Sequence, residues 1–351
     1  MKTFREPRAL GTFLSLLLLC SGAIADSIPS QLPADVTMNK DAGRGNRLIV
    51  RLRLESGEEV PFFVDTGASG TFIDKSLEPK LGKRLGTGIG SHFGAKHKFG
   101  IYAAPKLYLG NTPLMTGSNI ATGGFKLLSF ISGRPIKGML GMDCLRHYCI
   151  QLDFEAGKMR FLDAHHLNAA ELGKPFRLTF RGNRPFIHHT DLLEATNTNP
   201  LIDTGFNSDG VVEKGAIKGH NSGTFLRRVR NFLVERIAIA FGRLLEVGTV
   251  RLPVRFPKCV WDGETYTDIK VGVGEHADLI GLRFLARHLV TMDFPNRTLY
   301  LKKTSTGPLV HKSTKAAKIG GKDDAGCEAK GVILAESRRR FGVGRVWIAN
   351  Q

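Results

Sequence analysis

Two acidic residues, each at the end of an apolar run, are the part of this sequence best suited to chemistry. Phe62-Phe63-Val64 leads into Asp65-Thr66-Gly67-Ala68-Ser69, and Pro200-Leu201-Ile202 leads into Asp203-Thr204-Gly205. The positions of the two acids differ by 203 − 65 = 138. A carboxylate at the inner end of a strand is expensive to bury alone, so it needs a compensating partner. One such triplet also describes an ordinary strand-to-turn junction, but its repetition indicates a shared role.

Two carboxyl groups a few ångströms apart cannot both ionise easily, so the pair shares a proton. The charged member can take a proton from a water molecule held between them. The neutral member can donate a proton to a carbonyl oxygen as that group becomes tetrahedral. This chemistry suits amide hydrolysis without a metal or a covalent intermediate, and we expect Asp65 and Asp203 to be the catalytic residues.

An internal repeat of the chain would position the two acids. Leu279-Ile280-Gly281-Leu282 matches Met139-Leu140-Gly141-Met142 at an offset of 279 − 139 = 140. Val211-Val212-Glu213 matches Phe72-Ile73-Asp74 at an offset of 211 − 72 = 139. The offset therefore changes very little, from 138 to 140, across a whole lobe, which predicts two duplicated lobes.

Alternation of apolar and polar residues predicts a strand over residues 47–54, and a turn at 56–59 returns the chain through 60–64 to Asp65. The glycine-rich stretch 81–100 is typical of a mobile hairpin or loop. Further elements predicted in this lobe are strands at 106–109 and 127–131, an apolar run with a short helix at 138–145, and a closing hairpin at 150–162.

With these motifs in place, the sequence resembles the aspartic peptidases of the retropepsin-like and pepsin-like clan. Asp65 to Ser69 matches the active-site signature of that family, and Asp203 to Gly205 matches its second copy. Met139-Leu140-Gly141 and Leu279-Ile280-Gly281 resemble the element that threads through the psi-shaped loop of each lobe. The resemblance covers residues 46–302. It implies an all-β fold of two pseudo-symmetric, retropepsin-like β-barrel lobes, with a cleft for a polypeptide substrate between them.

The resemblance also implies roles for the residues around the acids, and it implies no metal and no cofactor. Thr66 and Thr204 would brace the two loops against each other. The supporting loops would comprise Thr66, Gly67, Thr204, Gly205, Gly141 and Gly281, and the flap that closes over substrate would contain Gly86, Gly88 and Gly90.

The sequence departs from the family pattern at three places. Phe206 stands where a small residue is usual, Ala68 lacks the hydroxyl that can follow the first triplet, and the flap stretch has no tyrosine. These departures leave an alternative open, in which a peptide-binding pseudoenzyme keeps the bilobal cleft without turnover. Retention of both acids favours the enzyme, whereas Phe206 favours the alternative.

The N-terminal segment 1–25 has the pattern of a secretory signal peptide. A basic region that ends at Arg8 precedes the apolar run 13–19, and Ala23-Ile24-Ala25 is typical of a cleavage site. We expect cleavage after Ala25, an extracytoplasmic protein (periplasmic or secreted), and no stable membrane insertion afterwards. Lipid attachment at Cys20 is the less favoured alternative, because Leu19 stands where a small residue is expected.

Composition excludes a mainly disordered chain, because 42% of the 351 residues are hydrophobic. The net charge of +18 suits anionic surfaces or acidic partners. No nucleic-acid motif accompanies this charge, so we expect a solvated basic surface and no nucleic-acid partner. The adjacent pairs His165-His166 and His188-His189 should point to opposite faces of a strand, so neither pair makes a metal site alone.

Four cysteines follow the signal segment, and in an exported protein they permit disulfides of undetermined connectivity, although some can be core thiols. They are Cys144, Cys149, Cys259 and Cys327. We expect Asp153 and Asp293, at equivalent positions of the closing hairpins, to be structural partners of a turn or a basic residue.

The expected organisation is a monomer whose two lobes form an intramolecular pseudo-dimer. Its segments are the signal peptide 1–25, an N-terminal linker 26–44, lobe 1 at 45–163, a connector 164–183, lobe 2 at 184–303, and a basic C-terminal tail 304–351.

Overall fold

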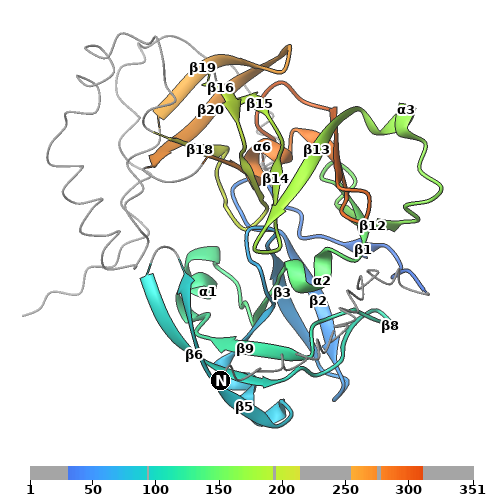
Figure 1. The fold of residues 1–351 in the computed structure, drawn as a ribbon, viewed down its shortest axis with the longest axis vertical. Coiled ribbons are helices and arrows are strands. Elements are labelled where there is room, and N and C mark those ends of the chain that lie inside the picture. The colour runs from blue at the N-terminus through green and yellow to red at the C-terminus, as the bar shows by residue number, and fades with distance from the viewer. Residues whose placement is uncertain (1–30, 93–94, 193–194, 214–253, 275–277, 311–351) are drawn as a thin grey trace, which may run out of the picture. The chain divides into compact units, whose positions relative to one another are not determined.

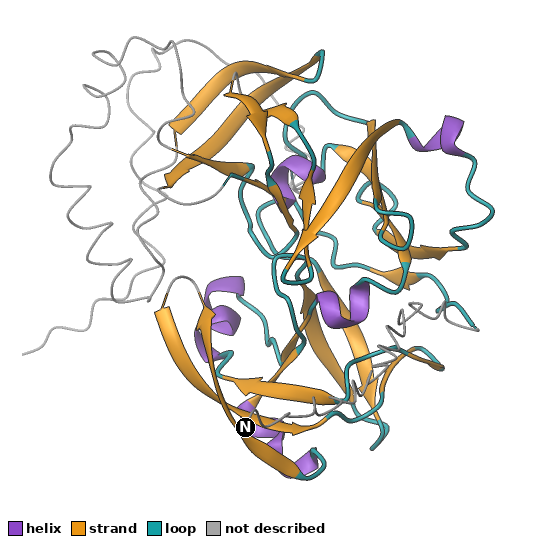
Figure 2. Cartoon of the chain, viewed as in Figure 1, coloured by secondary structure: helices purple, strands orange, loops and turns teal. Residues whose placement is uncertain are grey.

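The computed structural model describes residues 31–92, 95–192, 195–213, 254–274 and 278–310 (Figure 1). The predicted signal peptide and residues 311–351 of the predicted tail lie outside this described part. The described residues are mostly β-structure with a few short helices (Figure 2). No helix in them is long and apolar enough to span a membrane.

The first lobe contributes a nine-stranded mixed sheet in the order β5-β6-β9-β4-β10-β3-β2-β7-β8. Its strands are β2 (Ile49–Leu54), β3 (Glu59–Val64), β4 (Phe72–Asp74), β5 (Arg84–His92), β6 (Ala95–Ala103), β7 (Leu107–Leu109), β8 (Thr112–Pro113), β9 (Asn119–Gly123) and β10 (Gly138–Leu140). The accompanying helices are the 3₁₀ helix η1 (Lys75–Lys80), α1 (Lys126–Ser132) and α2 (Met142–Leu145).

The second large sheet has twelve strands in the order β1-β12-β11-β22-β23-β13-β14-β17-β21-β18-β20-β19. Three of these strands come from the first half of the chain: β1 (Val36–Thr37), β11 (Cys149–Asp153) and β12 (Lys158–Leu162). The others are β13 (Lys174–Arg181), β14 (Arg184–Ile187), β17 (Leu201–Asp203), β18 (Gly210–Glu213), β19 (Val254–Trp261), β20 (Glu264–Gly274), β21 (Leu279–Gly281), β22 (His288–Asp293) and β23 (Thr298–Lys303). A separate pair, β15 (Thr190–Leu192) and β16 (Ala195–Thr198), and the helices α3 (Ala169–Leu172) and α6 (Leu282–Leu285) complete the described elements.

The strands thus form two large mixed sheets, and the two β-barrels that we expected are not detected in the described residues. The pairing of the closing hairpins gives a physical reason. The β11–β12 hairpin of the first lobe pairs through β11 with β22 of the second lobe, so its hydrogen bonds extend the sheet of the other lobe.

The strand pairing confirms the predicted internal repeat. In each lobe a short strand is parallel to the strand that leads to the acid and antiparallel to the next one: β10 lies between β3 and β4, and β21 between β17 and β18. Met139 pairs with Phe72 and Leu279 with Val211, as the offsets of 140 and 139 require.

An approximate twofold axis passes between β11 and β22. Gln151 is opposite Thr291 in this antiparallel pair, and the two positions differ by 291 − 151 = 140, so equivalent residues meet. The Gln151 Nε2 atom donates a hydrogen bond of 3.1 Å to Thr291 Oγ1. The two lobes are therefore joined by continuous backbone pairing at their symmetry axis.

The predicted first hairpin is confirmed, and its alternation explains its packing. In β2, Val50, Leu52 and Leu54 are buried, whereas Arg51 between them is exposed. Each such apolar side chain contributes about 1.5–3 kcal/mol when it is buried. The hairpin in the glycine-rich stretch is formed by β5 and β6, and the predicted strand at 106–109 and closing hairpin are also present.

The strand predicted at 127–131 is wrong, because this segment forms helix α1. Leu128 and Ser132, four residues apart, are buried, which is helical rather than strand periodicity. Gly133 follows with a φ of 63°, a left-handed conformation that glycine adopts readily and that ends the helix. Phe130, an apolar residue of this segment, is 84% exposed.

The segment 26–44 differs from the expected linker in its described part. Val36 pairs with Met159 in β12, and both Met38 and Ala42 are buried in the core. The expected connector 164–183 likewise includes β13, which pairs with β23. Both segments are integral to the twelve-stranded sheet, because their apolar residues and backbone groups are used in it.

The three described cysteines are buried. Cys144 and Cys149 are free thiols, in agreement with the core-thiol interpretation, and burial raises the pKa of Cys144 well above its ordinary value. Cys327 lies outside the described residues. Asp153 accepts a turn hydrogen bond from Ala156 N, and Asp293 from Asn296 N, which confirms both as turn partners.

Candidate active site

The two triplets form matching loops, each at the end of a central strand. In the first loop, Ala68 N donates to Asp65 O at 3.3 Å, and Ala68 O accepts from Met142 N at 2.9 Å. In the second loop, Phe206 N donates to Asp203 O at 3.3 Å, and the oxygen of the same Phe206 accepts from Leu282 N at 2.8 Å. The loops are thus closed by the same backbone bonds despite their different sequences.

Gly141 and Gly281 lie directly behind these loops. A Cβ on Gly141 would be 2.2 Å from Gly70 O, and a Cβ on Gly281 would be 2.3 Å from Ser208 O. Only glycine permits such close approach of two backbones. The close approach of the two backbones is the physical reason that glycine stands at both positions.

Thr66 and Thr204 join the two loops by four reciprocal hydrogen bonds. Thr66 Oγ1 donates to Ile202 O at 2.6 Å and accepts from Thr204 N at 3.1 Å. Thr204 Oγ1 donates to Val64 O at 2.9 Å and accepts from Thr66 N at 3.0 Å. Both threonines are fully buried. Their expected bracing contacts are present, and they fix the two loops at the symmetry axis.

These contacts bring Asp65 and Asp203 together. A Cβ on Gly67 would be 2.5 Å from Asp203 Cγ, and a Cβ on Gly205 would be 2.4 Å from Asp65 Cγ. Each triplet glycine therefore lies against the carboxyl group of the opposite lobe.

The two acids differ in their hydrogen-bond donors. Asp65 Oδ1 accepts one backbone bond, from Gly67 N at 2.8 Å. Asp203 Oδ1 accepts two, from Gly205 N at 2.9 Å and from Phe206 N at 3.0 Å. Backbone donors favour the ionised form of a carboxyl group. Asp203 is therefore better suited to carry the negative charge of the pair.

Burial raises the pKa of both acids, and the negative charge of Asp203 adds to the increase at Asp65, whose pKa lies well above its ordinary value. The backbone donors at Gly205 and Phe206 limit the increase in the pKa of Asp203. Asp65 is therefore the member of the pair that more readily holds a proton, and Asp203 the member that more readily carries the negative charge.

Phe206, the residue that favoured the alternative without turnover, is accommodated without loss of the backbone bonds that close the second loop. Its Cδ1 atom would be 2.8 Å from a Cβ on Gly281, so the ring occupies space that this glycine leaves open. Its backbone N–H supplies the additional donor to Asp203. Sequence reasoning missed this donor, because a backbone group carries no side-chain signature.

Arg47 is a second component that sequence reasoning missed. Its Nη1 atom donates to Gly205 O at 3.2 Å, across 158 residues of chain, and its positive charge acts on both Asp65 and Asp203. The sequence shows only an arginine at the start of a strand, and no motif distinguishes it there.

A buried ion cluster supports the second loop. Asp209 Oδ1 accepts from Arg287 Nη2 at 3.0 Å, Asp209 also contacts Arg283, and its backbone oxygen accepts from Gly281 N at 2.9 Å. At the equivalent place in the first loop, Thr71 Oγ1 donates to Asp143 and accepts from Gly141 N at 3.1 Å (209 − 71 = 138). Different chemistry thus anchors the same glycine element in each lobe.

The glycines expected in the flap, Gly86, Gly88 and Gly90, all lie in β5 of the β5–β6 hairpin. A Cβ on Gly88 would lie 2.4 Å from the Phe99 ring, so the lack of a side chain at Gly88 leaves room for this ring. Phe99 also packs edge-on against Phe72, with ring centroids 5.4 Å apart.

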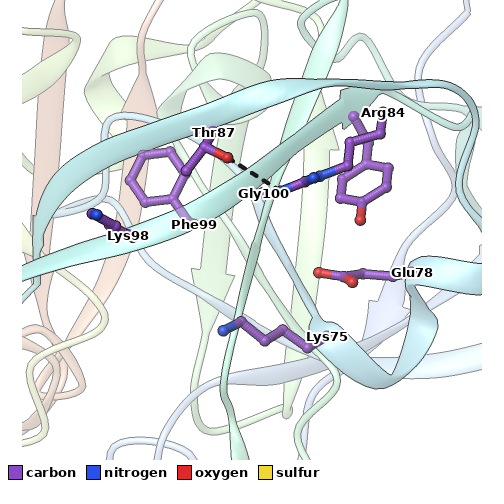
Figure 3. Close-up of a pocket in the computed structure, with 8 residues that line it drawn as sticks. Lys75, Glu78, Arg84, Thr87, Lys98, Phe99 and Gly100 are labelled. Carbon is purple, nitrogen blue, oxygen red and sulfur yellow. Dashed lines mark hydrogen bonds between the residues drawn. The ribbon is translucent and has the colours of Figure 1, made fainter.

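An open cavity of about 410 Å³ lies between this hairpin and η1 (Figure 3). Arg84 Nη2 donates to Thr87 Oγ1 at 3.1 Å on its rim. The lining residues are Lys75, Glu78, Arg84, Thr87, Lys98, Phe99, Gly100 and Tyr102. Neither Asp65 nor Asp203 is among them, so this cavity is separate from the pair of acids.

The described residues contain no group of three or more histidine, cysteine or acidic side chains placed to hold a metal. The His188 and His189 rings are 4.0 Å apart rather than on opposite faces. His189 has a φ of 46°, which breaks the strand alternation on which that expectation relied. His166 Nδ1 is 2.7 Å from Asp163 Oδ2.

Comparison with known proteins gives a likeness of structure alone. No family model and no curated protein sequence matches the chain. Among solved structures, the chain is similar to the crystal structure of the aspartic proteinase from Irpex lacteus, with a TM-score of 0.48 and 13% sequence identity. The match covers 78% of this chain and 98% of that chain.

Proposed function

We propose that this protein is an exported aspartic endopeptidase that hydrolyses peptide bonds with a water molecule activated between Asp65 and Asp203. The observation that carries the proposal is that two duplicated loops, joined by Thr66 and Thr204, bring Asp65 and Asp203 together, with burial raising the pKa of both. Groups with shifted pKa values and complementary protonation states are typical of acid–base catalysis.

In this mechanism Asp203 is the base and Asp65 the acid. The Asp203 carboxylate accepts a proton from water as the water oxygen attacks the peptide carbonyl carbon. Asp65 donates its proton to the carbonyl oxygen, and a tetrahedral diol forms. The C–N bond then breaks as the amine nitrogen receives the proton held by Asp203, and a diol hydroxyl returns its proton to Asp65. Both acids end in their starting protonation states.

The proposal includes a polypeptide held in a cleft between the lobes, with the hairpin that contains Gly86, Gly88 and Gly90 as the flap. We also propose that the protein is a monomer, because both acids belong to one chain and the reciprocal hydrogen bonds of Thr66 and Thr204 form within that chain. Export follows from the signal-peptide pattern that ends at Ala25. N-terminal sequencing of secreted material should begin at Asp26, whereas a lipidated start at Cys20 would contradict it.

A peptide-binding protein without turnover is the alternative. Phe206 favoured it in the sequence, but the second loop keeps its backbone bonds around that residue and gains a donor to Asp203. Two desolvated acids are also costly to keep in a site that only binds peptides. The enzyme is therefore the better supported function.

The test is cleavage of a peptide library by the purified mature chain, with and without pepstatin. Asp65→Asn and Asp203→Asn should each abolish cleavage. Asp163→Asn is the matched control, because the side chain of this exposed acid bonds to His165 N and to the His166 ring of its own turn, far in the sequence from both triplets. Substantial cleavage by either site variant would overturn the proposal. Peptide binding without cleavage by the wild-type chain would favour the alternative.

A further inference from the structure

The charge next to the pair of acids points to a role for Arg47, an inference that rests on the proposed function. We propose that Arg47 is a positioning residue with two roles. It restrains the second active-site loop through its hydrogen bond to Gly205, and it places a positive charge near both carboxyl groups. As a result, Asp65 and Asp203 together carry one negative charge at mildly acidic pH. Arg47 lies outside both triplets and both glycine elements.

The segment that carries Arg47 contacts the second lobe at three points. Arg47 Nη1 donates to Gly205 O at 3.2 Å, and Gly45 O accepts from Asn207 Nδ2 at 2.9 Å. A Cβ on Gly43 would be 2.3 Å from Ala286 Cβ. Two of these contacts are with the loop that contains Asp203, so the segment restrains that loop.

The same segment is anchored to the first lobe by Asn39. Asn39 Nδ2 donates to Arg47 O at 2.9 Å, and Asn39 Oδ1 accepts from Ile49 N at 2.7 Å. Asn46 Nδ2 also donates to Asp41 Oδ2 at 3.0 Å. Arg47 therefore belongs to a preorganised turn, and its side chain reaches the second lobe from a fixed backbone.

Packing contacts alone do not offset the free-energy cost of burying Arg47. Its Nε atom is buried and has no hydrogen-bond partner among the described residues. Burial lowers the pKa of Arg47, while the charges of Asp65 and Asp203 raise it. A half-buried cation without a close ion pair is destabilising unless nearby negative charge compensates it. The positive charge of Arg47 in turn lowers the pKa of both acids.

The repeat supplies a matched arginine in the second lobe. Ile49 pairs with Phe63 and Phe186 pairs with Leu201, where 201 − 63 = 138, so Arg184 occupies the position that corresponds to Arg47. Arg184 is exposed, and its guanidinium lies over the Phe186 ring at 5.9 Å. Of these two arginines, Arg47 lowers the pKa of both acids, whereas Arg184 lies over a ring at the surface of its own lobe.

The test compares Arg47→Met, Arg47→Gln and Arg184→Met in the full mature chain. The first readout is the pH dependence of kcat/KM on a peptide. The second is the titration of the ¹³C-labelled aspartate carboxyl carbons by NMR, with Asp65 and Asp203 assigned from their Asn variants. Loss of a nearby positive charge disfavours carboxylates, so both Arg47 variants should move the acidic limb and the titration up by about one pH unit.

Arg47→Gln keeps an amide donor for Gly205 O while it removes the charge, so it carries the test if Arg47→Met does not fold. Arg184→Met should titrate like the wild type. A folded Arg47→Gln variant with wild-type titration would overturn the inference. If the wild type cleaves no peptide, the proposed function fails, and the NMR titration still decides whether Arg47 acts on the pair.

Discussion

Replacement of Thr66 by valine tests whether the interlock of the two loops holds the site together. Valine has nearly the shape of threonine but lacks the hydroxyl. The change removes the bond from Thr66 Oγ1 to Ile202 O, at 2.6 Å, and the bond from Thr204 N to Thr66 Oγ1, at 3.1 Å. Both partners then lose a hydrogen bond at a fully buried position, where water cannot replace it.

The expected cost follows from those two groups. A buried donor or acceptor left unpaired costs about 1–3 kcal/mol, so Thr66→Val should lower the free energy of unfolding by about 2–6 kcal/mol. That is a large share of the roughly 5–15 kcal/mol that stabilises a typical protein. Thr204→Val should cost a similar amount, because its hydroxyl makes the symmetry-related pair of bonds.

Urea unfolding of the mature chain measures this cost, with the slope compared between variants to check that the transition is of the same kind. Thr37→Val, at an exposed position of β1, is the control and should change the free energy by less than about 0.5 kcal/mol. The double variant should cost less than the sum of the two single changes, because loops already loosened have less to lose. A loss below about 1 kcal/mol in both single variants would refute the reasoning.

Three further predictions concern the same loops. Gly67→Ala should destabilise the chain by about 1–3 kcal/mol in thermal melts, because the new Cβ would lie 2.5 Å from Asp203 Cγ. Gly70→Ala is the control, because a Cβ there meets nothing within 4 Å; equal melting temperatures of the two variants would contradict this prediction. Asp65→Asn should be more stable than the wild type at pH 7. Burial raises the folded-state pKa of Asp65, so wild-type stability falls as the pH rises above the unfolded value of about 3.9, and an unchanged stability difference between pH 3 and pH 7 would refute it. Cleavage by the wild type should be fastest at mildly acidic pH, and an optimum near pH 2–3 would contradict this. Ala68→Ser should shift the acidic limb of the pH profile of kcat/KM to lower pH, because a hydroxyl donor favours the carboxylate.

The sequence by itself determined the elements whose signals are local or periodic. The two acid-containing triplets, the glycine elements and the nearly constant offset between the two lobes were visible in it, and the register of β10 and β21 confirms the offset. Side-chain alternation was sufficient for β2, because Val50, Leu52 and Leu54 are buried and Arg51 between them is exposed. The helix at 126–132 was mistaken for a strand, because a short apolar run without context fits either structure.

Only the tertiary structure decided how the segment before β2 is used and which acid of the pair more readily carries the negative charge. Arg47 reaches Gly205 across 158 residues, so no local pattern marks the contact. Asp203 gains its second donor from the backbone of Phe206, a group that every residue except proline possesses and that only the loop conformation directs at the carboxylate. The polarity of the pair therefore arises from burial and from the geometry of backbone donors, which exist only when both lobes are folded against each other.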